Sequence, residues 1–155
     1  AEHFSPAIPC TRGQAVTFLW RAAGKPAASS AVTFSDVADD AYCAEAVRWA
    51  ASLGIVTGYG GGSFRPGTTV TREQMAAFLF RFAKAQGMDT TQGGMAVREF
   101  SDYDSISPWA GQSMTWAVNA GILSGRGNNT LAPTAGATRA EMAVMLQQFV
   151  GLMEK

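Results

Sequence analysis

The sequence holds little of the chemistry that most enzymes and metal sites need. Among its 155 residues are one histidine, His3, and two cysteines, Cys10 and Cys43. No nucleophile is paired with a base in a recognisable spacing, and no two acidic residues recur in a catalytic arrangement. We therefore expect a protein that is not an enzyme and that carries no metal or other cofactor.

The two cysteines leave two alternatives open. They are too few for a disulfide framework or a cysteine-rich metal site. A disulfide between Cys10 and Cys43 would contribute roughly 4 kcal/mol through the loop that it closes. Alternatively, both residues are small buried thiols that contribute only packing.

Excess charge and long apolar runs are also missing. Basic and acidic residues both number 12, so the formal net charge is zero, and no basic surface for nucleic acid or an anionic membrane is expected. No apolar run approaches the roughly 18–20 residues that span a bilayer. Residues 1–20 also lack the basic start and apolar core of a signal peptide. We expect no nucleic-acid partner and no insertion into a membrane.

The sequence does contain a repeated segment, Thr-Arg-x-(Gln/Glu). Each copy follows a proline by five residues and opens a long apolar segment; the copies are Thr11–Gln14, Thr71–Gln74 and Thr138–Glu141. Threonine followed three residues later by Gln or Glu is typical of a helix-starting capping box. The apolar stripes that follow are wide enough for burial on more than one side. They predict three helices that pack together as a central bundle.

A second block of motifs occurs twice and completes the repeat. Residues 34–36 and residues 100–102 both read Phe-Ser-Asp, and similar glycine loops begin at Gly54 and Gly121. The segment between these markers has helical spacing of apolar residues, and a glycine directly after a helix favours its end. Each complete unit therefore predicts an outer helix, a glycine loop and then a central helix.

Polar residues mark where the outer helices should begin. Asp39 or Asp40 is expected to cap the helix of unit two, and Ser107 that of unit three. No convincing strand is found. A minor β pairing within residues 59–64 or 97–100 remains an alternative.

The repeats predict one all-α module that spans residues 1–155. Unit one covers residues 1–26, unit two 34–86 and unit three 100–155. Unit one contains only the second half of the repeat. We therefore expect the natural chain to extend upstream.

The arginine of each motif calls for its own explanation. A cation in the first helical turn faces the positive end of the helix dipole, at a cost of roughly 0.3–1 kcal/mol. Arg12, Arg72 and Arg139 nevertheless occupy this position. One explanation is a bidentate pair with a carboxylate, for which Asp36 and Asp102 are the repeated candidates. The other is an anionic ligand held by the guanidinium and the helix-start amides. The two roles are compatible.

The aromatic residues of the outer helices fall into two groups. Trp49 and Trp116 have the spacing of core residues. Tyr42 and Trp109 stand in the first turn, nearer solvent, where an aromatic face can stack on a sugar.

Taken in order, these motifs resemble S-layer homology repeats. The matching pattern runs Phe-x-Asp-Val, an aromatic helix start, Ala-Val-x-Trp-Ala, Gly-Ile-Val-x-Gly-Tyr, Phe-x-Pro and Thr-Arg-x-(Gln/Glu), and residues 34–74 are the nearest copy. The resemblance implies a pseudo-threefold module with a central three-helix bundle. Outer helix-loop prongs would surround the bundle, with grooves between neighbouring prongs.

The resemblance also implies a function and a site. Such modules anchor exported bacterial proteins to secondary cell-wall polysaccharide or a peptidoglycan-linked glycan, which often carries an acidic pyruvyl ketal. The location implied is extracellular, in the cell wall or S-layer. By similarity, three arginines would meet the acid while the other residues line the grooves: Arg12, Arg72 and Arg139, then Asp36, Asp102, Tyr42, Trp109, Gly58 and Gly125.

The loop of unit three departs from the pattern. Arg126 stands where unit two has Tyr59, and Leu131 where it has Phe64. This departure favours an alternative in which the module keeps the fold but serves a structural role or binds other surface proteins.

Overall fold

The computed structural model describes residues 8–28, 34–56, 62–90, 94–125 and 129–153. The α-helices are α1 (Arg12–Ala22), α2 (Ala44–Ser52), α3 (Arg72–Ala85), α4 (Gly111–Asn119) and α5 (Arg139–Met153). Short 3₁₀ segments are η2 (Ala96–Glu99), η3 (Tyr103–Ser105) and η4 (Pro108–Ala110). The all-α prediction is confirmed. The alternative of β pairing at residues 97–100 is wrong because η2 occupies residues 97–99, and half of the other stretch, residues 59–61, lies outside the described ranges.

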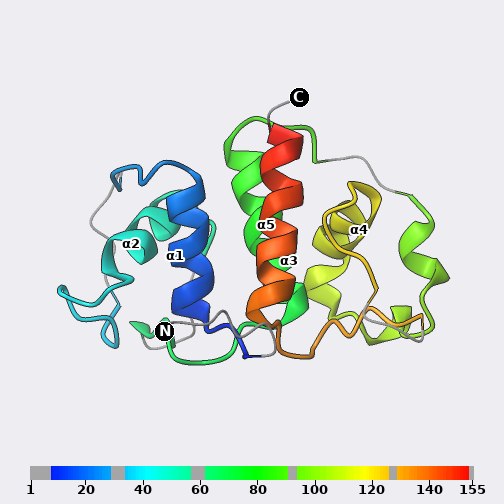
Figure 1. Cartoon of the computed structure of the whole chain (residues 1–155), viewed down its shortest axis with the longest axis horizontal. Coiled ribbons are helices and arrows are strands. Elements are labelled where there is room, and N and C mark those ends of the chain that lie inside the picture. Colours follow the sequence, from blue (N-terminus) through cyan, green and yellow to red (C-terminus); the bar gives the residue numbers. More distant parts are fainter. Residues whose placement is uncertain (1–7, 29–33, 57–61, 91–93, 126–128, 154–155) are drawn as a thin grey trace, which may run out of the picture.

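Helices α1, α3 and α5 stand side by side and start from the same end of the molecule (Figure 1). Helix α1 contacts α5. Phe82 of α3 packs against Phe149 of α5, with ring centroids 5.7 Å apart. The outer helices flank this bundle, α2 against α1 and α4 against α3. The outer helix of each complete unit therefore packs on the central helix of the unit before it.

The three central helices begin as the motif predicts. In each, the threonine hydroxyl accepts the amide of the Gln or Glu, and that side chain accepts the threonine amide. The two distances are 3.1 and 3.0 Å for Thr11–Gln14, 3.1 and 2.9 Å for Thr71–Gln74, and 3.1 and 3.0 Å for Thr138–Glu141. The capping boxes are confirmed.

The side-chain caps predicted for the outer helices do not form, although Ser107 does occupy an N-cap position. Helix α2 begins beyond Asp39 and Asp40 and has no side-chain cap. Asp39 instead pairs with Arg48 at 2.6 Å on the exposed face of the helix. Ser107 is the N-cap residue of η4, but its side chain makes no cap hydrogen bond, and its hydroxyl donates to Glu73 at 2.5 Å instead. Asp39 and Ser107 therefore each have a partner outside the helix start that they were expected to cap.

The predicted ends of the outer helices are correct. Gly54 and Gly121 follow the last residues of α2 and α4 with φ of 76° and 78°, the left-handed backbone that glycine adopts without strain. Trp49 and Trp116 are each only 3% exposed and belong to the core. The helical spacing of apolar residues along each outer helix therefore identified its buried face correctly.

Cys10 and Cys43 are both buried free thiols, so the disulfide alternative is not realised. Burial raises the pKa of Cys10 to about 11, although the charge of Arg139 acts in the opposite direction. A thiol with such a pKa is almost entirely protonated at neutral pH and is a poor nucleophile.

Isolated backbone bridges join the three motif segments in one cyclic order. Each links a motif threonine to the residue two positions before another motif threonine. The pairs are Thr11–Thr69, Thr71–Gly136 and Thr138–Pro9. These bridges place the three helix starts on a shared base, while the pseudo-threefold symmetry of the whole module stays a prediction.

Candidate functional site

The turn at residues 64–66, which ends the outer loop of unit two, is held from two sides. The carboxylate oxygens of Asp36 accept the amides of Phe64 and Arg65, each at 2.8 Å. The Nε of Arg12 donates to the Phe64 carbonyl at 3.0 Å, and its guanidinium lies 4.6 Å from the centre of the Phe64 ring. Arg12 and Asp36 therefore fix the same turn from different repeats.

Unit three repeats this arrangement. The carboxylate of Asp102 accepts the amides of Leu131 at 2.7 Å and Ala132 at 2.8 Å. The Nε of Arg72 donates to the Leu131 carbonyl at 2.7 Å. Both motif arginines are thus part of the contact between consecutive repeats.

The aspartates are held as carboxylates in both turns. Partial burial alone would raise the pKa of Asp36 and Asp102. Backbone hydrogen bonds to each carboxylate and the nearby charge of Arg12 or Arg72 have the opposite effect and outweigh it. Both pKa values therefore lie below the usual value. The negative charge therefore contributes to holding each turn at neutral pH.

The turns carry strained residues. Arg65 and Ala132 occupy the same place in the two repeats and have φ of 62° and 49°. Left-handed backbone costs an L-residue roughly 1–2 kcal/mol. Each of these two residues donates its amide to an aspartate, so the carboxylates stabilise a backbone that the sequence disfavours.

Arg72 makes two further hydrogen bonds that the sequence alone did not indicate. One terminal nitrogen donates to Glu141 at 2.9 Å and the other to the Ser124 carbonyl at 2.7 Å. The Arg72 side chain is only 3% exposed, while that of Glu141 is 23% exposed. Because the second Glu141 oxygen accepts the Thr138 amide, Glu141 caps α5 and neutralises Arg72 at once.

A signal for this pair was present in the sequence. The position of Glu141 in the motif is held by the neutral Gln14 and Gln74 in the other two copies. A carboxylate is not needed for the capping box, since glutamine forms it equally well in α1 and α3. The additional charge of Glu141 therefore pointed to a second partner.

A groove of about 220 Å³ opens beside Arg72, between the end of α4 and the start of α5. One part of its lining is polar and the rest is mostly apolar. The polar side is formed by Arg72, Ser124 and Glu141, and the remainder by Ile122, Leu123, Gly125, Ala140, Val144 and Met145. Of the predicted site residues, the groove brings together Arg72 and Gly125.

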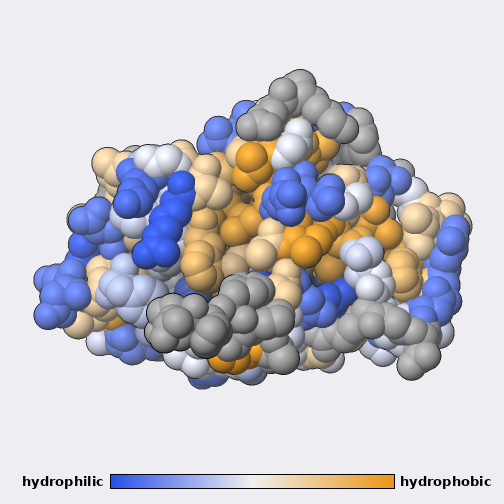
Figure 2. All heavy atoms as spheres, in the orientation of Figure 1, coloured by the Kyte–Doolittle hydropathy of each residue, from blue (hydrophilic) through white to orange (hydrophobic). Residues whose placement is uncertain are grey.

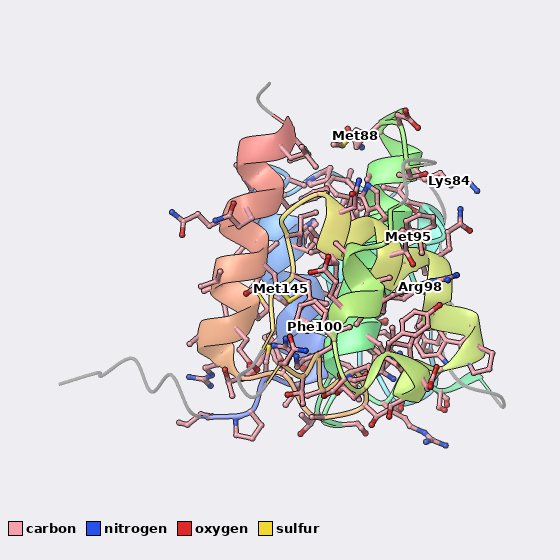
Figure 3. The ribbon with its side chains drawn as sticks, turned by 90° about the vertical axis from the view of Figure 1, so that its right-hand side faces the viewer. Lys84, Met88, Met95, Arg98, Phe100 and Met145 are labelled. Atoms are coloured by element: carbon pink, nitrogen blue, oxygen red, sulfur yellow. The ribbon has the colours of Figure 1, made fainter. Side chains whose placement is uncertain are left out.

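Gly125 is constrained by packing as well as by its place in the groove. A Cβ at this position would lie 2.7 Å from the Phe100 ring, a distance that real side chains do not tolerate. Phe100 directly follows η2, which packs against α4. Figure 3 shows Met95 and Arg98 along this segment and Phe100 at its lower end.

Arg139 differs from the other motif arginines. Its backbone amide donates to the Ile8 carbonyl at 3.0 Å. Its Nε is buried, yet it has no hydrogen-bond partner among the described residues. Arg139 also does not line the groove beside Arg72.

The remaining predicted residues lie apart from this groove. Tyr42 is 63% exposed and Trp109 is 55% exposed, as expected for aromatic residues near solvent. The Tyr42 hydroxyl is 2.9 Å from where a Cβ at Gly13 would stand, which places it at the start of α1. Gly58 lies outside the described residues.

The sequence also did not predict the role of one buried acidic residue, Glu73. Glu73 is 3% exposed and accepts both the amide of Ser107 at 3.0 Å and its hydroxyl. It joins the start of α3 to the beginning of the unit-three outer helix. The same motif position holds Gly13 and Ala140 in the other copies, so the repeat pattern did not indicate its role.

Neither metal binding nor a membrane span is indicated by the described part of the chain. It contains no group of three or more His, Cys, Asp or Glu side chains that could hold a metal ion. Within the same ranges, no helix combines the length and apolar character needed to cross a bilayer.

Comparison with known proteins identifies the family. The S-layer homology domain model matches residues 33–76 and 99–143. The first Thr-Arg motif lies outside both segments, so a truncated first repeat remains a prediction.

Several longer proteins contain a similar stretch. The chain is 38% identical over 79% of its length to an amylopullulanase of Thermoanaerobacterium thermosulfurigenes, covering 6% of that protein. It is 36% identical over 79% of its length to an exoglucanase of Acetivibrio thermocellus, covering 11%. A cellulosome-anchoring protein of the latter organism is 26% identical over 94% of the chain, which covers 33% of that relative. From the family match and these similarities, the chain belongs to the S-layer homology domain family.

Proposed function

We propose that this chain is a non-catalytic module that holds a bacterial protein at the cell surface by binding secondary cell-wall polysaccharide. Membership of the S-layer homology family supports this function. Two relatives, a cellulosome-anchoring protein and a cell surface glycoprotein, carry names that agree with it. The names of the hydrolase relatives describe proteins of which the chain spans only a small part, such as 6% and 11%.

The observation that carries the binding proposal is the groove that Arg72 lines beside an apolar wall, although the Arg72 side chain itself is only 3% exposed. An acidic, pyruvylated sugar would place its carboxylate near the guanidinium, which favours planar anions. The sugar C–H groups would lie against Val144 and Ile122. With about 220 Å³, the groove is smaller than the roughly 300–1,000 Å³ typical of drug-sized sites. It would suit one sugar residue better than a long segment of polymer.

Glu141 would weaken this binding, because its carboxylate competes with the sugar for Arg72. It already pairs with Arg72 at 2.9 Å, so an acidic sugar must compete with a protein carboxylate. We therefore propose modest affinity at this groove, with firm anchoring arising from several contacts along one polymer.

The other predicted residues enter the proposal in different ways. Asp36 and Asp102 would shape the grooves through the turns that they hold. Tyr42 and Trp109 would stack on sugar faces at the outer helices, because both rings are largely exposed. Direct contact of Arg12, Arg139 and Gly58 with the polymer is likewise proposed.

The test uses a pull-down with wall polysaccharide purified from the producing bacterium. Val144→Glu places a negative charge in the groove, and Val144→Gln is its matched neutral control. Because Val144 is 52% exposed, neither change should alter the melting temperature much. We expect the unmodified chain and the glutamine variant to bind, and the glutamate variant to lose most binding. Failure of the unmodified chain to bind any such preparation would overturn the proposal.

A second candidate function is a structural or protein-interaction module without polymer binding. The observation that favours it is the burial of Arg12 and Arg72, which are 5% and 3% exposed. Both side chains are hydrogen-bonded to the following repeat. Capture of surface proteins together with no binding to the polysaccharide would support this candidate.

A further inference from the structure

Arg81 of α3 is a half-buried cation with no acidic partner among the described residues. Its one hydrogen bond there runs from Nη1 to the Ile55 carbonyl at 2.9 Å, just past the end of α2. Its other nitrogens reach solvent, because in the described part of the chain the only buried side-chain nitrogen or oxygen without a partner is the Nε of Arg139. Arg81 therefore has hydrogen-bond donors to spare.

The charge of Arg81 is poorly compensated. Burial lowers the pKa of its guanidinium, and no neighbouring carboxylate acts against that shift in the described part of the chain. An arginine nevertheless stays charged at neutral pH. Since charges that are partly removed from water are normally paired, the spare donors of Arg81 are suited to an anion.

The repeat shows to which surface Arg81 belongs. Three positions on one face of a central helix, four and three residues apart, recur in α5 and α3. They are Glu141, Met145 and Gln148 in α5, and Gln74, Phe78 and Arg81 in α3. The first two of the α5 residues line the groove beside Arg72. Arg81 therefore lies on the α3 face that corresponds to a groove wall.

Two arginines reach this face of α3. A helical side chain points back toward the start of its helix, so that of Arg81 lies over the preceding turn. Its bond to Ile55 agrees with this, because Ile122, the counterpart of Ile55, lines the groove beside Arg72. The guanidinium of Arg12 lies 5.6 Å from the centre of the Phe78 ring.

The corresponding surfaces of units two and three differ in charge. In unit three, Glu141 neutralises Arg72 at 2.9 Å and Gln148 is neutral. In unit two, Gln74 replaces the competing carboxylate and Arg81 adds a cation. Apolar surface is visible in the region of α5 in Figure 2, in keeping with the mostly apolar lining of its groove.

The acidic residues nearby do not cancel this difference. Glu73, at the position of Ala140, is 3% exposed, and its two oxygens accept the amide and hydroxyl of Ser107. Asp36 and Asp102 add one negative charge each to their own turns. With all of them counted, the unit-two surface remains more positive than the unit-three surface by one charge.

We infer that Arg81 binds the acid of the wall sugar and, with the nearby charge of Arg12, makes the unit-two surface a stronger anion site than the groove beside Arg72. The inference rests on the proposed function, for which it names a further contact. The bond to Ile55 fixes the Arg81 side chain, while its other donors meet the carboxylate. A purely structural Arg81 would instead only stabilise the end of α2 through the helix dipole.

The test measures binding of the pyruvylated wall polysaccharide by isothermal titration calorimetry. Arg81→Gln gives α3 the residue that α5 has at position 148. We expect at least about tenfold weaker binding, because a charge-assisted hydrogen bond is lost. Polymer stripped of its ketal should bind the variant and the unmodified chain equally.

Two further variants make the test specific. Arg21→Gln is the matched control, with the same substitution at the same repeat position of α1, where the arginine is exposed. Its affinity should stay within about twofold of the unmodified chain. Gln148→Arg is the reciprocal variant and should tighten binding several-fold by adding a cation beside the Arg72 groove. Because Gln148 is exposed, this variant keeps the test decisive if Arg81→Gln does not fold.

The outcomes separate this inference from the proposed function. Weaker binding by Arg81→Gln but not by Arg21→Gln, for the pyruvylated polymer alone, supports the inference. Unchanged affinity of a folded Arg81→Gln overturns it while the proposed function stands, and a lower melting temperature in that case assigns Arg81 to the end of α2 alone. Equal losses in both glutamine variants, or no gain in Gln148→Arg if Arg81→Gln does not fold, also overturn it. No binding by the unmodified chain overturns the proposed function and the inference together.

Discussion

Arg12 and Asp36 both hydrogen-bond the backbone of one residue, Phe64, Arg12 at its carbonyl and Asp36 at its amide. The arginine Nε donates to its carbonyl at 3.0 Å and the carboxylate accepts its amide at 2.8 Å. Arg12 begins α1, whereas Asp36 and Phe64 belong to the next repeat. The contact explains why a cation occupies a helix start where the dipole disfavours it. Its hydrogen bonds between repeats outweigh a local penalty of roughly 0.3–1 kcal/mol.

Arg72→Ala should be strongly destabilising. It removes hydrogen bonds to Leu131 and Ser124 and leaves the partly buried Glu141 without its cation. We expect the free energy of unfolding to fall by on the order of 3 kcal/mol, measured by urea denaturation. Arg139→Ala is the matched control and should cost about 1 kcal/mol or less, because its Nε has no partner among the described residues. Equal losses would contradict the assigned roles.

Asp102→Asn should reduce stability in a manner that depends on pH. The pKa of Asp102 is lower in the folded protein than its usual value of about 3.9, so the carboxylate stabilises the folded state above that pH. This contribution disappears as pH falls through the folded-state pKa. The melting-temperature difference between the two proteins should be largest near neutral pH and shrink below about pH 4. A difference that grows on acidification would contradict the account.

Ala132→Gly should stabilise the unit-three turn slightly. Ala132 has φ of 49°, a backbone that costs an L-residue roughly 1–2 kcal/mol and glycine almost nothing. The larger entropy of glycine in the unfolded chain offsets part of this gain, so we expect up to about 1 kcal/mol from chemical denaturation. Ala143→Gly, inside α5, should instead destabilise by roughly 0.5–1 kcal/mol. A loss of the same size at both positions would argue against strain at Ala132.

Glu73 and Ser107 should prove energetically coupled. The buried carboxylate accepts both the amide and the hydroxyl of Ser107, at 3.0 and 2.5 Å. A double-mutant cycle with Glu73→Gln and Ser107→Ala should give a coupling energy of about 1–2 kcal/mol. Asp39→Ala and Arg48→Ala form an exposed comparison pair, expected at or below about 1 kcal/mol. Additive effects at Glu73 and Ser107 would show that this contact does not join the repeats.

The features predicted correctly were those encoded within a few residues. The capping box joins residues three positions apart, and Gly54 ends α2 by its own backbone preference. The missed features link distant segments. Glu73 meets Ser107 across 34 positions, and Arg72 meets Glu141 across 69. Only the packing of α4 on α3 and the cyclic order of the motif segments bring these pairs together.

The predicted bidentate pair of a motif arginine with an aspartate is wrong for Arg72, whose carboxylate partner is Glu141, although Asp102 and Arg72 do meet at the same turn. The sequence favoured a direct bidentate pair or an anionic ligand. The structure instead places both charges on one turn, with Asp102 on the amides and Arg72 on the carbonyl of Leu131. Such a turn-mediated contact depends on the left-handed backbone of Ala132, which no local sequence rule predicts for alanine.

The most direct test of the proposed acidic-sugar site is the affinity of Glu141→Gln for the wall polysaccharide, measured by isothermal titration calorimetry. Glutamine preserves the capping box, as Gln14 and Gln74 show, but removes the charge that competes for Arg72. The melting temperature of the variant verifies that it is folded. The account predicts tighter binding of the pyruvylated polymer and no such gain for polymer stripped of its ketal. Weaker binding of the pyruvylated polymer, or equal gains for both polymers, would contradict the proposal that Arg72 receives the acid.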